Sequence, residues 1–276
     1  MDPATILVIA GKEFCDLWRS RWFAVMAAAF ASLSLALSLL GTASVGLAGV
    51  AGFGRTTASL LSLVMLIVPL MGLVMGAMSL AGEREQGMLL ALLAQPVTPT
   101  EVLAGKLAGL SGALAAAVLG GFALSGLVIA RAGGGSGLRE YLVFAGLTVG
   151  LGVVHVVLGL WISAVSRRSA SALGAAVFVW MAVVIFGDLG IMGTAVVLRL
   201  TPAQLLWLGF GNPAQVFRLA VLQALHGDLD ALGAAGAYAA WRLGGWLLPF
   251  LLAALAAWAI VPLLAAWAQF RRRGAL

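Results

Sequence analysis

Long apolar runs separated by short polar segments dominate the hydrophobic pattern of this chain. Several runs reach about 18 residues or more, which is enough for an α-helix to cross a bilayer. Strands of a membrane barrel would alternate apolar and polar residues, and these runs do not. The pattern therefore predicts an all-α polytopic membrane protein, with a single transmembrane domain over residues 1–276 and six spans at Trp22–Leu40, Ser59–Ala81, Leu107–Ala130, Tyr141–Val165, Ala172–Gly187 and Leu243–Phe270.

The segment before the first span, residues 6–21, is mixed rather than fully apolar. One face of a helix built from it is apolar and includes Leu7 and Trp18, while the other carries the charges of Lys12, Glu13 and Asp16. This pattern predicts an amphipathic helix that lies along the membrane surface. The alternative is the n-region of a signal peptide, but the two acidic residues and the length of the following apolar run argue against it.

The segment 188–241 differs from the rest because glycine and proline break it repeatedly. We interpret it as a periplasmic or half-inserted helical cap before the last span, with pieces such as Pro202–Leu208 and Pro213–Leu225. An additional span around Leu189–Leu208 would place the final arginine triplet outside, so we do not expect one. Between the spans we expect a glycine-rich loop that carries Arg55 and a short loop at Arg131–Glu140.

Composition supports a membrane protein, because 63% of residues are hydrophobic, only 9% are charged and the mean hydropathy is +1.10. Soluble domains carry about 25% charged residues. The isoelectric point near 10.7 does not indicate nucleic-acid binding, because the basic residues lie at the ends of apolar runs. Six spans place ten basic residues on the side of the termini: Lys12, Arg19, Arg21, Arg84, Lys106, Arg167, Arg168, Arg271, Arg272 and Arg273. The other side receives six: Arg55, Arg131, Arg139, Arg199, Arg218 and Arg242. This bias predicts that both termini are cytoplasmic.

Several kinds of site are excluded or disfavoured by the residues present. The single cysteine, Cys15, excludes a disulfide within one chain, and neither Lys12 nor Lys106 lies in a Walker A sequence. We therefore expect no bound nucleotide, metal or other cofactor. His155 and His226 differ in predicted depth, which disfavours haem, and a hydrogen bond between helices suits His155 better. Two further questions stay open. The stripe of Met71, Met75 and Met78 could bind copper or serve ordinary packing, and Cys15 could carry a persulfide or be an inert thiol.

Glycines four residues apart and one proline indicate how the spans pack. The pairs Gly72 with Gly76, Gly105 with Gly109, and Gly146 with Gly150 permit close helix approach. Such pairs are common in helical bundles, so they are weak evidence for a dimer. Pro69 lies inside the second span, where it predicts a kink.

The polar stretch from Glu83 to Lys106 separates two spans and carries most of the charge in this part of the chain. Gly87 can turn the backbone after Glu83-Arg84-Glu85. Met88–Ala94 forms a short apolar helix that Gln95-Pro96 ends, and Thr98 or Thr100 can cap the next helix with Glu101 in its first turn. We interpret the stretch, whose core is residues 83–101, as a lateral helix presented to a cytoplasmic partner. The alternative is an ordinary charged loop.

These residues resemble the signature of ABC-2 type ABC-transporter permeases. The matching elements are Glu-Arg-Glu-x-Gly at 83–87, the Leu92-Leu93 pair, the prolines followed by Glu101, and Gly105-Lys106. The resemblance covers the whole chain, although the family usually has Thr or Ser near Met88. It implies a non-catalytic subunit of the bacterial inner membrane that pairs with a second copy of itself and is driven by a separate cytoplasmic ATPase. It also implies that the ATPase contact involves Glu83, Arg84, Glu85, Gly87, Leu92, Leu93, Pro96, Glu101 and Lys106.

A narrower resemblance links the outer residues to the permeases of nitrous-oxide-reductase maturation systems. It rests on Asp188-Leu189-Gly190 and on Asn212-Pro213-x-x-x-Phe217-Arg218. It implies a periplasmic partner protein and export of a sulfur species for the copper–sulfide centre of the reductase, with Asp188, Asn212, Pro213 and Arg218 at the partner surface or exit. For Asp188, pairing with an arginine or exposure to water are the alternatives.

Two other functional classes remain to be compared with a transporter. An intramembrane enzyme would need a nucleophile and base, or a metal set, at one depth, and the spans contain none. A passive membrane anchor or mechanotransmitter for a periplasmic assembly is harder to exclude, but it would tolerate changes at Glu83 and Glu85 that a coupled transporter should not.

Overall fold

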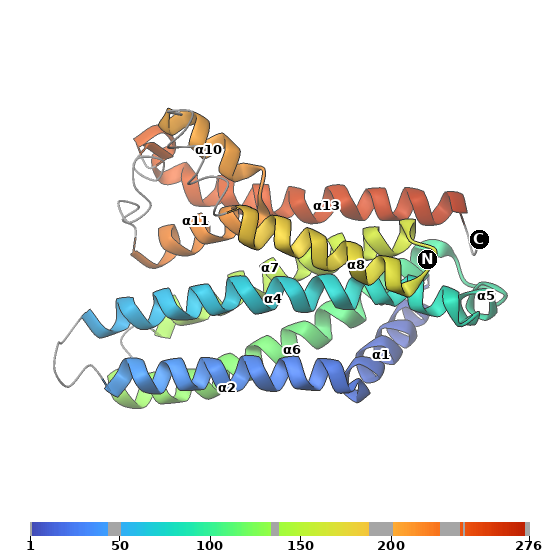
Figure 1. Cartoon of the computed structure of the whole chain (residues 1–276), viewed down its shortest axis with the longest axis horizontal. Coiled ribbons are helices and arrows are strands. Elements are labelled where there is room, and N and C mark those ends of the chain that lie inside the picture. The colour runs from blue at the N-terminus through green and yellow to red at the C-terminus, as the bar shows by residue number, and fades with distance from the viewer. Residues whose placement is uncertain are drawn as a thin grey trace.

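The computed structural model describes residues 2–43, 51–133, 138–187, 201–226, 238–239 and 241–273. Within these ranges the chain forms helices and no strand, which confirms the all-α class. The long helices run side by side along one axis (Figure 1). Six of the described helices are long and apolar enough to cross a membrane, in agreement with the predicted spans. They are α2 (Arg21–Ala43), α4 (Ala51–Glu85), α6 (Pro99–Gly133), α7 (Leu138–Val165), α8 (Ser169–Trp180) with its π-helical continuation η1 (Met181–Phe186), and α13 (Leu247–Arg273).

The helices extend past the predicted spans at the polar boundaries. The helix α4 begins at Ala51, so Arg55 lies within a helix and not in the predicted loop. The helix α6 continues to Gly133, and α7 starts at Leu138, which shortens the loop expected at Arg131–Glu140. Hydropathy marks only the stretch that needs a membrane, whereas helical hydrogen bonding continues into the polar flanks.

Glycines bring α4 and α7 into backbone contact. A Cβ atom added at Gly76 would lie 2.3 Å from the carbonyl oxygen of Val156, and one at Gly159 would lie 2.4 Å from that of Leu73. The pair Gly105 and Gly109 works in the same way between α6 and α1 (Pro3–Arg19), because added Cβ atoms would meet Ile9 and Ala10. Two of the three glycine pairs therefore serve packing within the chain. The third pair, Gly146 and Gly150, has open space beside it.

Both termini lie at the end of the bundle that carries the short helix α5 (Met88–Leu93) (Figure 1). The helix α1 begins there because Asp2 caps it, with its side chain accepting a hydrogen bond from the Ala4 amide, and because Pro3 suits the first helical position. The burial of side chains on α1 adds a contact that its amphipathic pattern does not predict, while its position along a membrane surface stays a prediction. Glu13 is buried and faces the bundle, whereas the apolar Leu7 and Trp18 are exposed.

The opposite end of the bundle carries α10 (Pro202–Phe210) and α11 (Pro213–His226), which are bent by 113° from each other. Thr201 and Gln204 form a capping box at the start of α10. The two helical pieces predicted for the cap are therefore present, and together they are apolar and long enough to count as a seventh, broken span. Their depth relative to a bilayer stays a prediction. Asp188 and Arg199 lie outside the described residues.

Candidate functional site

The turn after α4 presents α5 at one end of the molecule. Gly87 has φ of 73°, a left-handed conformation that glycine adopts without strain, and it separates α4 from α5. Leu89 is fully buried and anchors α5 to the core, while Met88 and Leu90 are 48% and 60% exposed. Leu92 and Leu93 are half-buried, and Pro96 is exposed. This end therefore offers a small apolar surface held by one buried leucine.

The start of α6 is fixed by a capping box between Thr98 and Glu101. The Thr98 amide donates to Glu101 Oε2 at 2.8 Å, and the Glu101 amide donates to Thr98 Oγ1 at 3.3 Å. Of the two predicted caps, Thr98 is the one used, while Thr100 accepts a hydrogen bond from the Trp267 indole at 3.1 Å. The other carboxylate oxygen of Glu101 accepts the Asp2 amide at 2.7 Å. Glu101 thus joins the starts of α6 and α1 and is itself buried.

A cluster of ion pairs, hereafter the latch, joins α1, α4 and α6 behind α5. Lys106 Nζ lies 2.7 Å from Glu13 Oε1 and 2.8 Å from Glu83 Oε2. Lys12 Nζ lies 2.5 Å from Glu83 Oε1 and 3.2 Å from Glu13 Oε1. The two lysines are the only ones in the chain, and each bridges the same two carboxylates, which are close to fully buried.

Burial makes the latch sensitive to the loss of any member. The Lys106 side chain is 0% exposed, so its charge is tolerable only because two carboxylates surround it. Burial alone would lower the pKa of the half-exposed Lys12. Its hydrogen bonds and charge contacts with Glu83 and Glu13 outweigh that effect and raise the pKa above the ordinary value of 10.5. Lys12 is therefore charged at physiological pH.

Arg84 and Glu85 tie the end of α4 to the neighbouring spans. The Arg84 guanidinium donates to the backbone carbonyls of Ser163 and Ser166, at the end of α7. Glu85 accepts hydrogen bonds from the amide and hydroxyl of Ser169, the first residue of α8. In addition, the Ser163 hydroxyl donates to the carbonyl of Ala77 on α4 at 2.6 Å. The segment that presents α5 is therefore connected to α7 and α8 as well as to α1 and α6.

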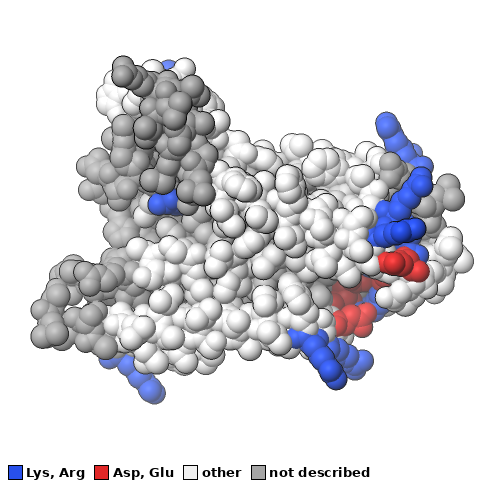
Figure 2. All heavy atoms as spheres, viewed as in Figure 1, with Lys and Arg blue, Asp and Glu red and all other residues white. Residues whose placement is uncertain are grey.

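Three of the charged side chains of the predicted coupling stretch are not oriented toward an exposed surface, and the role of the stretch in coupling stays a prediction. Glu83, Glu101 and Lys106 point inward and hold helices together instead of lining an exposed surface. Lys12 and Glu13 were missed as members of the site. Two features of the sequence could have pointed to these residues. Glu13 and Lys106 lie among apolar residues, and the two lysines lie next to an acidic residue or a glycine on their helices. In Figure 2 the acidic side chains of the visible face gather at this same end.

The predicted outer residues shape the opposite end. Asn212 Nδ2 donates to the carbonyl of Val183 in the π-helical η1 at 2.6 Å, and its Oδ1 accepts the Ala214 amide at 2.9 Å. Asn212 thereby caps α11 and pins it to the end of the fifth span. Pro213 is buried at the first helical position, and Arg218 is half-buried. Only Asp188 of this predicted set cannot be placed, because it lies outside the described residues.

The residues considered for metals and redox chemistry are dispersed. Within the described ranges, no group of three or more His, Cys, Asp and Glu side chains could hold a metal ion. His155 is fully buried, and its Nδ1 lies 2.8 Å from the carbonyl oxygen of Leu151 in the same helix, so this contact is not the expected bond between helices. Met71 and Met75 are core residues, whereas Met78 is 39% exposed. Cys15 is exposed.

Within the described residues, an all-helical bundle with six candidate spans defines a polytopic membrane protein. The sequence model of the family described as ABC-2 family transporter protein matches residues 7–275, so the chain belongs to this family. ABC-2 permeases are transport subunits that work with an ATPase subunit. As a multi-span permease the chain belongs in the bacterial inner membrane.

Two relatives span nearly the whole chain. The Probable ABC transporter permease protein NosY of Stutzerimonas stutzeri is 33% identical over 274 residues, which cover 96% of this chain and 97% of the relative. The protein of the same name from Pseudomonas aeruginosa is 33% identical over 278 residues, which cover 97% and 98%. The predicted resemblance to ABC-2 permeases is thereby confirmed.

Proposed function

We propose that this chain is driven by a separate cytoplasmic ATPase that docks on α5. The observation that carries the proposal is the exposed apolar side chain of Leu90 on a helix that Leu89 anchors. Apolar residues on a short projecting helix suit a protein groove better than bulk water. Because only the turn at Gln86-Gly87 separates α5 from α4, and α6 follows closely, a force on α5 reaches both spans directly.

The latch determines how a movement of α5 is transmitted to the other helices. Glu83 and Lys106 lie on α4 and α6, and Glu13 and Lys12 lie on α1. Separating these helices would leave charges buried without partners, which costs several kcal/mol. The ends of α1, α4 and α6 therefore move together as one unit, and Arg84 and Glu85 carry the movement to α7 and α8.

We place this end in the cytoplasm. The excess of basic residues predicted for the side of the termini supports this orientation, as does the position of both termini beside α5. The outer end with α10 and α11 then faces the periplasm, where Asn212, Pro213 and Arg218 lie at the surface for a periplasmic partner protein. Asp188, which lies outside the described residues, stays a sequence-based candidate for the same surface. A second copy of the chain completes the membrane unit, as the resemblance to ABC-2 permeases implies.

The NosY relatives suggest the pathway in which the permease acts. We infer that this chain serves maturation of the copper–sulfide centre of nitrous-oxide reductase by export of a sulfur species. The second candidate is a passive anchor or mechanotransmitter for a periplasmic assembly protein, which the connection of α11 to the fifth span through Asn212 favours.

The test is a pair of leucine substitutions at opposite ends, in the chain co-expressed with its ATPase. Leu90→Asn places an amide on the proposed docking surface, and Leu208→Asn makes the same change at a residue of α10 that is 46% exposed. We expect Leu90→Asn to weaken co-purification of the ATPase about tenfold, as loss of an interface anchor does, and Leu208→Asn to leave it unchanged. Equal co-purification of both variants would contradict docking on α5.

The same variants separate the transporter from the passive anchor. In cells that lack their own permease, nitrous-oxide reductase activity should be restored by wild type and not by Leu90→Asn. If Leu90→Asn loses the ATPase yet still restores the reductase, the chain acts as an anchor. If wild type restores no activity, the chain serves another pathway.

A further inference from the structure

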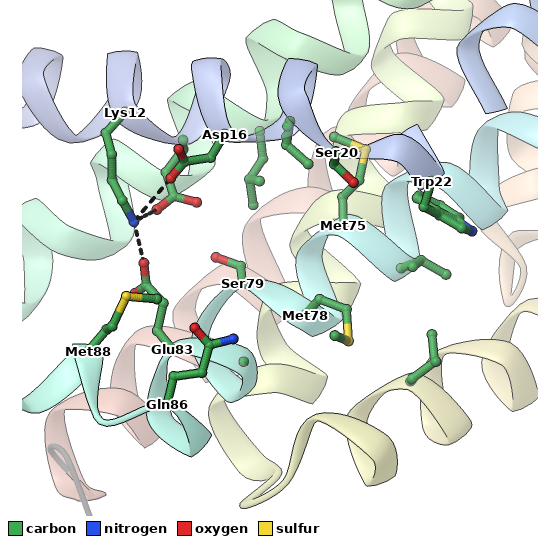
Figure 3. A pocket seen from close by; sticks show the side chains of 16 residues that line it. Lys12, Asp16, Ser20, Trp22, Met75, Met78, Ser79, Glu83, Gln86 and Met88 are labelled. Carbon is green, nitrogen blue, oxygen red and sulfur yellow. Dashed lines mark hydrogen bonds and ion pairs between the residues drawn. The ribbon is translucent and has the colours of Figure 1, made fainter. Parts of the chain in front are cut away.

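A cavity of about 420 Å³ lies beside the latch, and Met88 of α5 is among the residues that line it. It runs along α4, between α1 with the start of α2 on one side and α8 on the other (Figure 3). Its lining changes character from one end to the other. The polar end holds Lys12, Asp16 and Ser79, and the apolar end holds Trp22, Met75 and Met78. A cavity with this gradient suits an amphiphile better than a water-soluble ion.

The polar end has unused hydrogen-bonding capacity. The Ser79 hydroxyl is buried, makes no hydrogen bond and points toward the gap between α1 and α4. Asp16 Oδ2 lies 3.6 Å from Lys12 Nζ, which has closer contacts with Glu83 and Glu13. The Asp16 carboxylate, about half exposed, can therefore accept further donors.

The charges around this end also favour a cation. Three carboxylates, of Glu13, Asp16 and Glu83, face the two ammonium groups of Lys12 and Lys106, which leaves one negative charge. A ligand that brings one ammonium group to Asp16 would balance the site. At the rim, Ser20 lies between Arg19 and Arg21, which are exposed and suited to a phosphate.

We propose that this cavity binds a phospholipid with a primary-amine headgroup, namely phosphatidylethanolamine. The ammonium group donates to Asp16 and Ser79, the phosphate lies near Arg19 and Arg21, and one acyl chain follows Met75 and Met78. The bilayer is the source of the ligand because α1 continues directly into the first span and Trp22 lies at the cavity. Phosphatidylcholine has no ammonium N–H donor, and phosphatidylglycerol has no cation, so neither satisfies the polar end.

The test measures which lipids stay bound to the full chain in complex with its ATPase. The complex is reconstituted in nanodiscs of equal parts phosphatidylethanolamine, phosphatidylcholine and phosphatidylglycerol with matched acyl chains, then released into neutral detergent for native mass spectrometry. Asp16→Asn removes the charge that binds the ammonium group, and Met78→Trp fills the apolar end. Glu140→Gln, at the start of α7 far from the latch, is the matched control for loss of one negative charge.

We expect wild type and Glu140→Gln to retain phosphatidylethanolamine in preference to the other two lipids. Asp16→Asn should reduce that retention about tenfold, the effect of losing one charge-assisted hydrogen bond, and Met78→Trp should reduce retention of all bound lipid at this site. Equal retention of the three headgroups by wild type would overturn the proposal and indicate annular lipid only. Unchanged phosphatidylethanolamine retention in Asp16→Asn would overturn it as well.

Discussion

Lys106 is the residue on which the latch depends most, because it is fully buried and bridges Glu13 and Glu83. Lys106→Met would leave the two carboxylates with Lys12 alone. We expect this change to lower the free energy of unfolding by about 3–5 kcal/mol, the usual cost of breaking a buried ion pair from one side. Titration with dodecyl sulfate, followed by loss of helical circular dichroism, measures the difference.

A second substitution tests whether the loss comes from unpaired charge. Glu13→Gln/Lys106→Met removes one charge of each sign and should recover part of the stability lost in Lys106→Met. If the double variant is less stable than Lys106→Met by the full effect of Glu13→Gln, the two side chains do not interact and our account of the latch is wrong.

The charge of Lys12 predicts how the latch responds to pH. Its pKa is raised in the folded protein, so its contribution is fully present below the unfolded value of 10.5 and is lost as pH rises through the folded value. The stability difference between wild type and Lys12→Met should therefore stay constant between about pH 6 and pH 9. A difference that disappears within that range, in thermal unfolding followed across pH, would show that Lys12 is not held by Glu83 and Glu13.

At the scale of elements, the contact between α4 and α7 depends on glycine. Gly76→Ala would place a methyl group 2.3 Å from the Val156 carbonyl oxygen, so the helices must separate. We expect a loss of about 1–3 kcal/mol of stability, typical of overpacking. Gly146→Ala is the matched control, because it lies on α7 with open space beside it and should stay within about 1 kcal/mol of wild type. Equal unfolding midpoints in detergent would show that α4 and α7 tolerate the separation.

The spans could be predicted from the sequence, but their side-chain partners could not. A run such as Ser59–Ala81 identifies itself by length and hydropathy, because a bilayer imposes both. The short helix after Gly87 and the cap at Thr98 were also predictable, since turns and caps use local residues. The partners of charged side chains could not be predicted from local residues. Glu13 and Lys106 are 93 positions apart, and only the packing of α1 on α6 brings them together.

The same limit applies to the charged residues of α1. Its charges form a polar face by periodicity, which normally faces water or headgroups. Here Glu13 on that face meets the buried Lys106, whereas Lys12 and Asp16 on the same face stay about half exposed. For that reason Glu83→Ala, an obvious test from sequence, cannot separate docking from stability, because it would leave Lys106 with one fewer carboxylate. Exposed residues of α5 such as Leu90 make that separation.

For the molecule as a whole, we propose different roles for the two ends, which long helices join. The α5 end gathers both termini and the latch, and the other end carries α10 and α11 (Figure 1). The helix α4 extends from Ala51 to Glu85, and α7 packs along it, so movement at one end reaches the other through rigid elements.

The most direct test of the central claim is the rate of ATP hydrolysis by the complex of this chain with its ATPase, reconstituted in nanodiscs. We predict that wild type and Leu208→Asn stimulate hydrolysis equally and that Leu90→Asn does not, even when the ATPase is supplied at concentrations that restore binding. Stimulation by Leu90→Asn at the wild-type rate would contradict coupling through α5. It would direct attention to the outer end, with α10 and α11, as the part of the chain that acts.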